Sequence, residues 1–240
     1  RTITYERVPD YWGKDLPVNR GQWNFDEIRF DYYRDETVAF ESFKAGNLDY
    51  HQETSAKNWA TAYDFAAVRD GWIKRQEVPI KSAQPMQCFV LNIRRPQFQD
   101  RRVRQAFNLA YDFEWANKNL FYGQYARVGS FFQGSELAAP AAPPQGRELE
   151  ILNEVKDQVP PEVFTEVHKN PVNNSSDDMR NNLRKAVQLL KEAGYEVKNG
   201  VLVNSKTGQP LTVEFLLVSP LFERIVQPYI GNLARLGIKA

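Results

Sequence analysis

The sequence predicts a mixed α/β fold, in which helices and strands alternate along the chain. Apolar residues alternate with polar ones in "TITYERV" and "DEIRFDYY", as is typical of strands. In "RVRQAFNLA" they recur three and four positions apart, which predicts a helix. At 240 residues the chain is long enough for one large domain or two modest ones.

The first elements predict a strand–helix–strand unit. Strands are expected at 2–8 and 26–33. Asp35 or Thr37 can cap the helix that follows, and Gly46 can end it in the left-handed conformation. The stretch "NLDYHQ" then resumes as a strand, and a unit of this order fits an α/β layer.

The next segments predict one helix and two strands. Residues 54–71 are expected to be helical, and "WIKRQEVP" after them to be a strand. The apolar run 88–91 lies between two prolines, which indicates a strand buried on both of its faces.

Two capped helices are expected after this run. Asp100 stands at the N-cap of the first, and Asp112 at that of the second, which Gly123 ends. The arginines of the first helix fall on its solvated sides. Its apolar face comprises Val103, Ala106, Phe107 and Ala110.

Residues 134–178 predict an irregular excursion, because "ELAAPAAPPQG" and "QVPPEVF" cannot hold a regular ladder. One short helix is expected within it, at 148–155. Asp177 or Asp178 then caps a helix that ends at Gly194.

The last segments predict a hairpin, a helix and a strand. The hairpin is "VLVNSKTGQPLTVEFLLV", with "NSKTGQP" as its loop. The final helix follows Pro220 and ends at Gly237, and "GIKA" begins another strand.

Composition excludes several classes of function. Lys and Arg total 31 and Asp and Glu total 30, so no concentrated basic surface for nucleic acid is expected. The single cysteine, Cys88, excludes both a disulfide within the chain and a multi-cysteine metal site. Neither a GxGxxG nor a GxxxxGK[ST] motif occurs, and no cofactor is expected.

One polar cluster allows an enzymatic alternative. Asp49, His51 and Glu53 share one side of the strand expected there, because successive side chains of a strand alternate. A metal or a hydrolase could use such a trio. Polar positions on a half-exposed strand are the preferred interpretation, so no catalytic or metal-binding residue is expected.

Four motifs resemble, in the correct order, elements of the family 5 extracellular solute-binding proteins: "FESFKAGNLDY", "VLNIRRPQFQDRRVRQAFNLAYDFEW", "NNLRKAVQLLKEAGY" and "VQPYIGNLARLGIKA". Within the family, "RRPQFQD", "YDFEWANKNLFYGQY" and "SELAAP" look most like the YejA-like oligopeptide-binding branch. The resemblance implies a two-lobed periplasmic binding protein type II fold. Residues 1–85 would be a partial first lobe and residues 86–240 the second. The chain would be an internal or C-terminal fragment, in keeping with its opening in mid-strand.

The resemblance also implies a function without bond chemistry. A monomeric receptor would capture oligopeptides in the periplasm, or while lipid-anchored outside a Gram-positive cell, and deliver them to an inner-membrane ABC permease. A nickel chelate, haem or a sugar stays open as the ligand.

The expected ligand contacts lie in two places. The crossover between the lobes offers Gln84, Gln87, Cys88 and Asn92, unless it is a plain buried strand. The loop before the excursion offers Ser130, Phe131 and Phe132, whose rings suit the lining of a cleft. The excursion 134–178 could cover the mouth of the cleft or decorate the surface.

Overall fold

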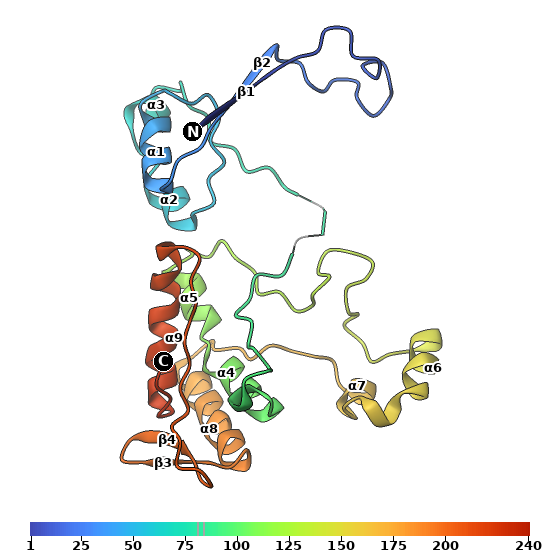
Figure 1. The fold of residues 1–240 in the computed structure, drawn as a ribbon, viewed down its shortest axis with the longest axis vertical. Helices are drawn as coiled ribbons and strands as arrows, with labels where there is room; N and C mark the ends of the chain where they lie inside the picture. The colour runs from blue at the N-terminus through green and yellow to red at the C-terminus, as the bar shows by residue number, and fades with distance from the viewer. Residues whose placement is uncertain (81, 84) are drawn as a thin grey trace. The chain divides into compact units, whose positions relative to one another are not determined.

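The computed structural model describes residues 1–80, 82–83 and 85–240, and the chain divides into two compact units (Figure 1). The first unit comprises residues 1–55 and 63–74, and the second comprises residues 56–62 and 75–240. Each unit combines helices with a two-stranded antiparallel sheet, which confirms the mixed α/β class. The division into lobes at residue 85 stays a prediction.

The sheet of the first unit consists of strands that are neighbours in the sequence. Strand β1 (Thr2–Glu6) pairs antiparallel with β2 (Glu27–Asp31), and Ile3 lies opposite Phe30. Both strands precede helix α1 (Glu36–Lys44). The strand expected in "NLDYHQ" is wrong, because those residues have no regular secondary structure, so the strand–helix–strand layer does not form.

Helix α1 follows the expected caps. The carboxylate of Asp35 accepts hydrogen bonds from Thr37 N at 2.7 Å and Val38 N at 3.3 Å. These bonds hold the pKa of Asp35 below its ordinary value. Gly46 takes the left-handed conformation, with φ of 79°, as a helix end requires.

The helix expected at 54–71 is interrupted. It forms two short pieces, α2 (Ala56–Thr61) and α3 (Ala66–Arg69). Between them, Tyr63 packs its ring 5.1 Å from Phe40 and donates its hydroxyl to Glu53 at 3.2 Å. This tertiary anchor overrides the helical periodicity. The strand expected in "WIKRQEVP" is also wrong, since none of these residues lies in a strand.

Three helices enclose the core of the second unit: α4 (Arg101–Ala110), α8 (Ser176–Glu192) and α9 (Glu223–Arg235). Asp100 caps α4 as expected, accepting from Arg102 N at 2.8 Å. All four residues of its expected apolar face are buried. The core also contains Phe98, Leu183, Ala186, Leu190, Leu202, Leu211, Tyr229 and Leu233.

Two further caps define neighbouring helices. Asp112 caps α5 (Phe113–Asn119) as expected, accepting from Trp115 N at 3.0 Å. The cap of α8 is Ser175, which corrects the expectation of Asp177 or Asp178. Ser175 Oγ accepts from Asp178 N at 3.1 Å, and Asp178 Oδ2 accepts from Ser175 N at 3.0 Å. Asp178 is thus the third residue of a capping box.

The second sheet has a strand that the sequence pattern did not reveal. Strand β3 (Tyr195–Lys198) pairs antiparallel with β4 (Val201–Asn204), and β4 is the first arm of the expected hairpin. The second arm is reduced to one bridge, between Val203 and Pro210. A parallel bridge joins Thr212 to Lys239, where "GIKA" was expected to begin a strand. The 3₁₀ turn Pro220–Phe222 leads into α9, and another, Pro96–Phe98, precedes Asp100.

The excursion carries short helices (Figure 1). Helix α6 (Gly146–Glu154) confirms the one expected at 148–155. A 3₁₀ turn (Lys156–Gln158) and helix α7 (Glu162–Thr165) follow it. Arg101 at the start of α4 contacts Glu162 at 3.3 Å, which links α7 to the helical core. Among the described helices, none has the length and apolar character needed to span a membrane.

Candidate functional site

The crossover segment, residues 85–92, is irregular and largely open. Between described residues, no backbone hydrogen bond involves positions 85–91. The prediction of a strand buried on both faces is therefore wrong: Val90 is 85% exposed, and none of the strands in the described part of the chain pairs with this run. A short apolar run becomes a buried strand only where partner strands flank it.

The side chains of Phe89 and Leu91 attach this segment to the helical core. The ring of Phe89 lies 5.8 Å from that of Tyr111, 5.6 Å from Phe215 and 5.5 Å from Tyr229. Phe215 and Tyr229 lie more than a hundred positions after Phe89 and Tyr111, so periodicity within one element could not reveal the cluster. Phe89 is thus an anchor of the segment that the sequence analysis did not name.

The expected contacts of the crossover differ in their surroundings. Gln87 and Cys88 are exposed, and the Cys88 thiol is free. Asn92 shapes a turn, since its Oδ1 accepts from Arg94 N at 3.1 Å and from Arg94 Nε at 3.3 Å. Gln84 lies outside the described residues. Gln87 and Cys88 therefore keep side chains that can reach a ligand, whereas the side chain of Asn92 is engaged locally.

The loop 130–139 is closed on itself by a serine. Ser130 Oγ accepts from Ala139 N at 3.0 Å and from Phe132 N at 3.4 Å. The hydroxyl of Ser135 donates to Phe132 O at 2.8 Å. Ser130 therefore has a structural role in the loop, which was not anticipated when it was predicted as a ligand contact.

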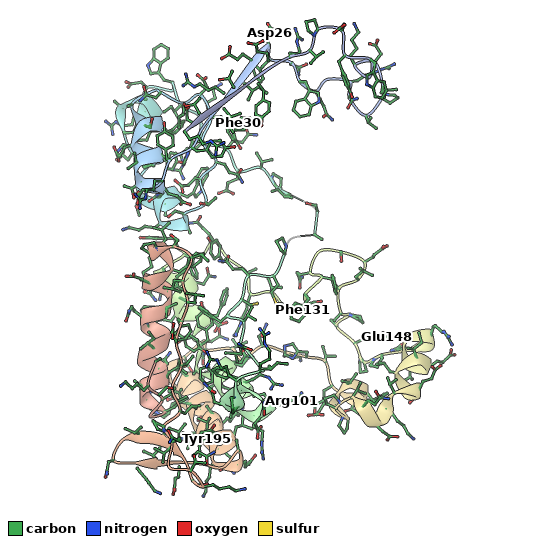
Figure 2. All side chains as sticks on the ribbon, viewed as in Figure 1. Asp26, Phe30, Arg101, Phe131, Glu148 and Tyr195 are labelled. Carbon is green, nitrogen blue, oxygen red and sulfur yellow. The ribbon has the colours of Figure 1, made fainter. Side chains whose placement is uncertain are left out.

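The same loop presents aromatic rings outward. Phe131, labelled in Figure 2, is 72% exposed, and Phe132 is 55% exposed. Gly134 has φ of +83°, and a Cβ placed on it would stand 3.7 Å from Cα of Ala83. At Gly134 the loop thus lies against Ala83, two residues before the crossover segment. The two sets of expected ligand contacts belong to neighbouring parts of one unit.

A pocket of about 250 Å³ lies beside the aromatic cluster, between α5, α8 and α9. Tyr111 and Tyr229 belong both to its lining and to the cluster around Phe89. Burial raises the pKa of Asp112 at its rim. The remaining lining residues are Trp115, Ala116, Met179, Ile225, Pro228, Asn232 and Arg235. The sequence analysis missed this pocket, because its walls come from distant helices.

The enzymatic trio does not converge. His51 stacks on Phe43 at 5.3 Å, and its Nε2 lies 3.6 Å from Glu53 Oε2. Glu53 Oε1 accepts from Ser55 N at 2.7 Å, so this carboxylate is occupied by local hydrogen bonding. Asp49 is exposed. In residues 1–80, 82–83 and 85–240, no three His, Cys, Asp or Glu side chains are grouped to hold a metal ion.

Comparison with known proteins gives a family match over the whole chain. The model of the bacterial extracellular solute-binding proteins, family 5 Middle, matches residues 1–240. A probable peptide-binding protein YejA of Agrobacterium fabrum is 51% identical over all of this chain, and YejA of Escherichia coli is 48% identical over 99% of it. A peptidoglycan-binding protein YepA of Agrobacterium fabrum is 36% identical over 98%. The chain spans 39% of the length of each of these relatives.

Solved structures share the fold. NikA of Brucella suis, in complex with Fe(III)-EDTA, superposes with a TM-score of 0.60 at 20% identity, over 98% of this chain and 39% of its own. The oligopeptide-binding protein AppA of Bacillus subtilis, in complex with a nonapeptide, gives 0.57 at 20% identity, over 99% of this chain and 38% of its own. These likenesses confirm the fold expected from the sequence motifs.

Proposed function

Because the chain belongs to the bacterial extracellular solute-binding proteins, family 5, we propose that it is part of the ligand-capturing component of an ABC importer. The full-length protein captures oligopeptides and delivers them to a permease in the inner membrane. The family match over residues 1–240 carries this proposal, and a 51% identical relative named as a probable peptide-binding protein supports it. The family is one of binding proteins and not of enzymes.

The backbone of the crossover segment supports a peptide as ligand. Residues 86–91 have N–H groups, and residues 85–91 have C=O groups, that no other described residue pairs with. An extended peptide offers the complementary groups at regular spacing, whatever its side chains. A ligand that pairs with this segment is therefore recognised by what all peptides share, which suits a receptor of broad specificity.

The side chains of the loop and the crossover supply the remaining contacts. Phe131 and Phe132 offer large apolar surface with few rotatable bonds, so they can contact varied ligand side chains at little entropic cost. Gln87 can both donate to and accept from a peptide group. Cys88 lies next to it and contributes a small, weakly polar surface.

Capture requires that the ligand is covered on a second side, and in the proposed two-lobed fold the other lobe covers it. Residues 1–85 contribute to one lobe and residues 86–240 to the other, and closure of the lobes shields the ligand from water. The protein acts as a monomer in the periplasm. The relatives from Agrobacterium and Escherichia coli lend no support to the alternative of a lipid anchor in a Gram-positive host.

The ligand class can be tested by native mass spectrometry of the full-length protein purified from its own host. The proposal predicts a heterogeneous set of bound peptides, which stay intact on incubation. The relative named as peptidoglycan-binding makes short peptidoglycan peptides one candidate within that set. A single bound chelate, haem or sugar would contradict the peptide proposal and favour a non-peptide receptor.

A variant separates the receptor from the hydrolase alternative. His51→Ala should leave peptide retention unchanged, because His51 packs within the first unit against Phe40 and Phe43. Peptide cleavage by the wild-type protein, abolished in this variant, would instead support an enzyme.

A further inference from the structure

The two ends of residues 129–169, which include most of the excursion, lie next to each other. Arg127 Nη1 donates to Pro171 O at 2.7 Å, and Asn170 Nδ2 donates to Val128 O at 2.9 Å. These two bonds run in opposite directions across the base of residues 129–169. That segment carries the loop 130–139, α6 and α7. Its two ends are therefore tied together by side chains that are more than forty positions apart in the sequence.

The guanidinium of Arg127 is also held by the core. Its Nη2 donates to Asn108 Oδ1 of α4 at 2.7 Å, and the rings of Tyr111 and Phe113 lie 5.8 Å and 5.9 Å from its central carbon. Burial lowers the pKa of Arg127, and the nearby carboxylate of Glu114 acts in the opposite direction. Because a guanidinium stays charged in proteins, Arg127 is a permanent donor that reaches the core and the returning chain at once.

The returning chain is fixed independently to two helices. Asn173 N donates to Glu114 Oε2 of α5 at 2.9 Å. Asn182 Nδ2 of α8 donates to Asn173 Oδ1 at 2.9 Å and contacts Val172 O at 3.2 Å. The end of the excursion is thus held by hydrogen bonds to α5 and α8, and Arg127 joins the start of the excursion to this end through Pro171 O.

The cluster contains an energetic cost. Asn173 Nδ2 is buried and has no hydrogen-bond partner among the described residues. A buried donor of this kind destabilises the fold, because it has lost its hydrogen bonds to water without gaining others.

We propose that Arg127 is a positioning residue for ligand binding. It clamps the two ends of residues 129–169 so that Phe131, four residues further on, and Phe132 are held beside the crossover segment. The hydrogen bonds described above support this clamp of the two ends, whereas its consequence for ligand binding rests on the proposed function. The residues that form the clamp are Asn108, Glu114, Arg127, Asn170, Asn173 and Asn182.

Hydrogen exchange of the full-length protein without ligand tests the clamp itself. Arg127→Met should raise the exchange rate of amides in 130–139 about tenfold or more, because opening of the loop loses its tie to Pro171. Arg127→Lys should behave in the same direction, since one ammonium cannot span Asn108 and Pro171 as the planar fork does.

Arg104→Met is the matched control. Arg104 Nη1 also donates to two carbonyls, Phe98 O at 2.7 Å and Gln99 O at 2.8 Å, but among the described residues no hydrogen bond or ion pair joins it to the excursion. This variant should leave exchange in 130–139 unchanged. Should Arg127→Met not fold, Asn170→Ala removes the second tie, to Val128 O, while leaving the buried charge in place. Unaltered exchange in the Arg127 and Asn170 variants that fold would overturn the clamp.

Retention of a random-sequence hexapeptide pool, measured by native mass spectrometry on the same variants, tests the ligand half. Arg127→Met should weaken retention about tenfold, equivalent to about 1.4 kcal/mol, and Arg104→Met should not. The double variant Phe131→Ala, Phe132→Ala should weaken retention without altering exchange at 165–173. Raised exchange with unchanged retention would overturn the positioning role. Failure of the wild-type protein to retain any peptide would overturn the peptide function, while the exchange result would still decide the clamp.

Discussion

At the residue scale, Gly237 shows how one position can depend on the absence of a side chain. Its φ is +79°, and a Cβ placed on it would stand 2.8 Å from Leu202 N and 3.2 Å from Gly200 O. The chain after α9 therefore passes directly over β4, where Leu202 N donates to Gly237 O at 2.8 Å. The expectation that this glycine ends the last helix was correct, but the close backbone approach has no signal in the sequence.

Gly237→Ala should destabilise the protein far more than Gly208→Ala. Gly208 also has a positive φ, of +71°, but a Cβ there would meet no atom within 4 Å. The second substitution should lower the free energy of unfolding by about 1–2 kcal/mol, the cost of a left-handed alanine. Gly237→Ala should lower the free energy of unfolding by the same amount and by about 1–3 kcal/mol more, because the new Cβ clashes with the backbone of β4. Urea unfolding of the two variants measures both values, and equal losses would contradict the proposed close approach.

The position of a functional residue is harder to predict than its type. Phe131 and Phe132 were proposed because aromatic rings suit the lining of a cleft, and the structure exposes both. Arg127 was not singled out, because its partners Asn108 and Pro171 lie on either side of it at distances that no local motif encodes. Only the fold brings them together.

At the element scale, α9 completes the end of α4. The last carbonyls of a helix lack partners within it. Tyr229 donates its hydroxyl to Phe107 O at 2.8 Å, and Asn232 Nδ2 donates to Ala110 O at 3.1 Å. Residues one turn apart on α9 thus satisfy two carbonyls in the last turn of α4, which fixes how the two helices pack.

Tyr229→Phe should lower the free energy of unfolding at neutral pH. It should also make that free energy fall less steeply as the pH rises above about 10. Burial raises the pKa of Tyr229 in the folded state, whereas an unfolded tyrosine ionises near about pH 10. Above that pH the unfolded chain loses a proton that the folded chain keeps, so the free energy of unfolding falls as pH rises. Phenylalanine has no hydroxyl to ionise, so the free energy of unfolding of the variant lacks the part of this pH dependence that Tyr229 contributes. At about pH 8 it should be less stable by about 1–2 kcal/mol, because Phe107 O loses its partner.

Urea unfolding at about pH 8 and about pH 11 measures the gap between the two proteins. The gap should narrow in alkali. The pKa values of Tyr111 and Tyr195 are also raised by burial, so both proteins keep some alkaline loss. If the difference in free energy of unfolding between the two proteins is unchanged or larger at the higher pH, burial does not raise the pKa of Tyr229 in the folded state.

Helices were predicted better than strands, for a local reason. Asp35, Asp100 and Asp112 each cap a helix through bonds to residues two or three positions away, so the signal lies within a short window. A strand depends on a partner elsewhere in the chain. The run 88–91 has the composition of a buried strand but no partner among the described residues, whereas the less apolar "YEVK" pairs with β4.

At the scale of the whole molecule, four motifs in order identified the family and the fold, which local periodicity alone could not do. The four motifs cover helices α1, α4, α8 and α9, three of which enclose the core of the second unit. The proposed ligand contacts lie less on these helices than in irregular segments. Neither the crossover 85–92 nor the loop 130–139 has a periodic pattern, so the approach of Gly134 to Ala83, just before the crossover, had to come from the structure.

The central claim is that the full-length protein recognises the backbone of a peptide. Calorimetric titration with hexapeptides of unrelated sequence, and with the same peptides N-methylated at alternate amides, tests it directly. The account predicts that unmodified peptides bind with affinities within about tenfold of one another, and that N-methylation weakens each by about tenfold or more, because the donors that pair with the crossover are removed. Equal affinity for methylated and unmodified peptides, or no heat from either, would contradict it.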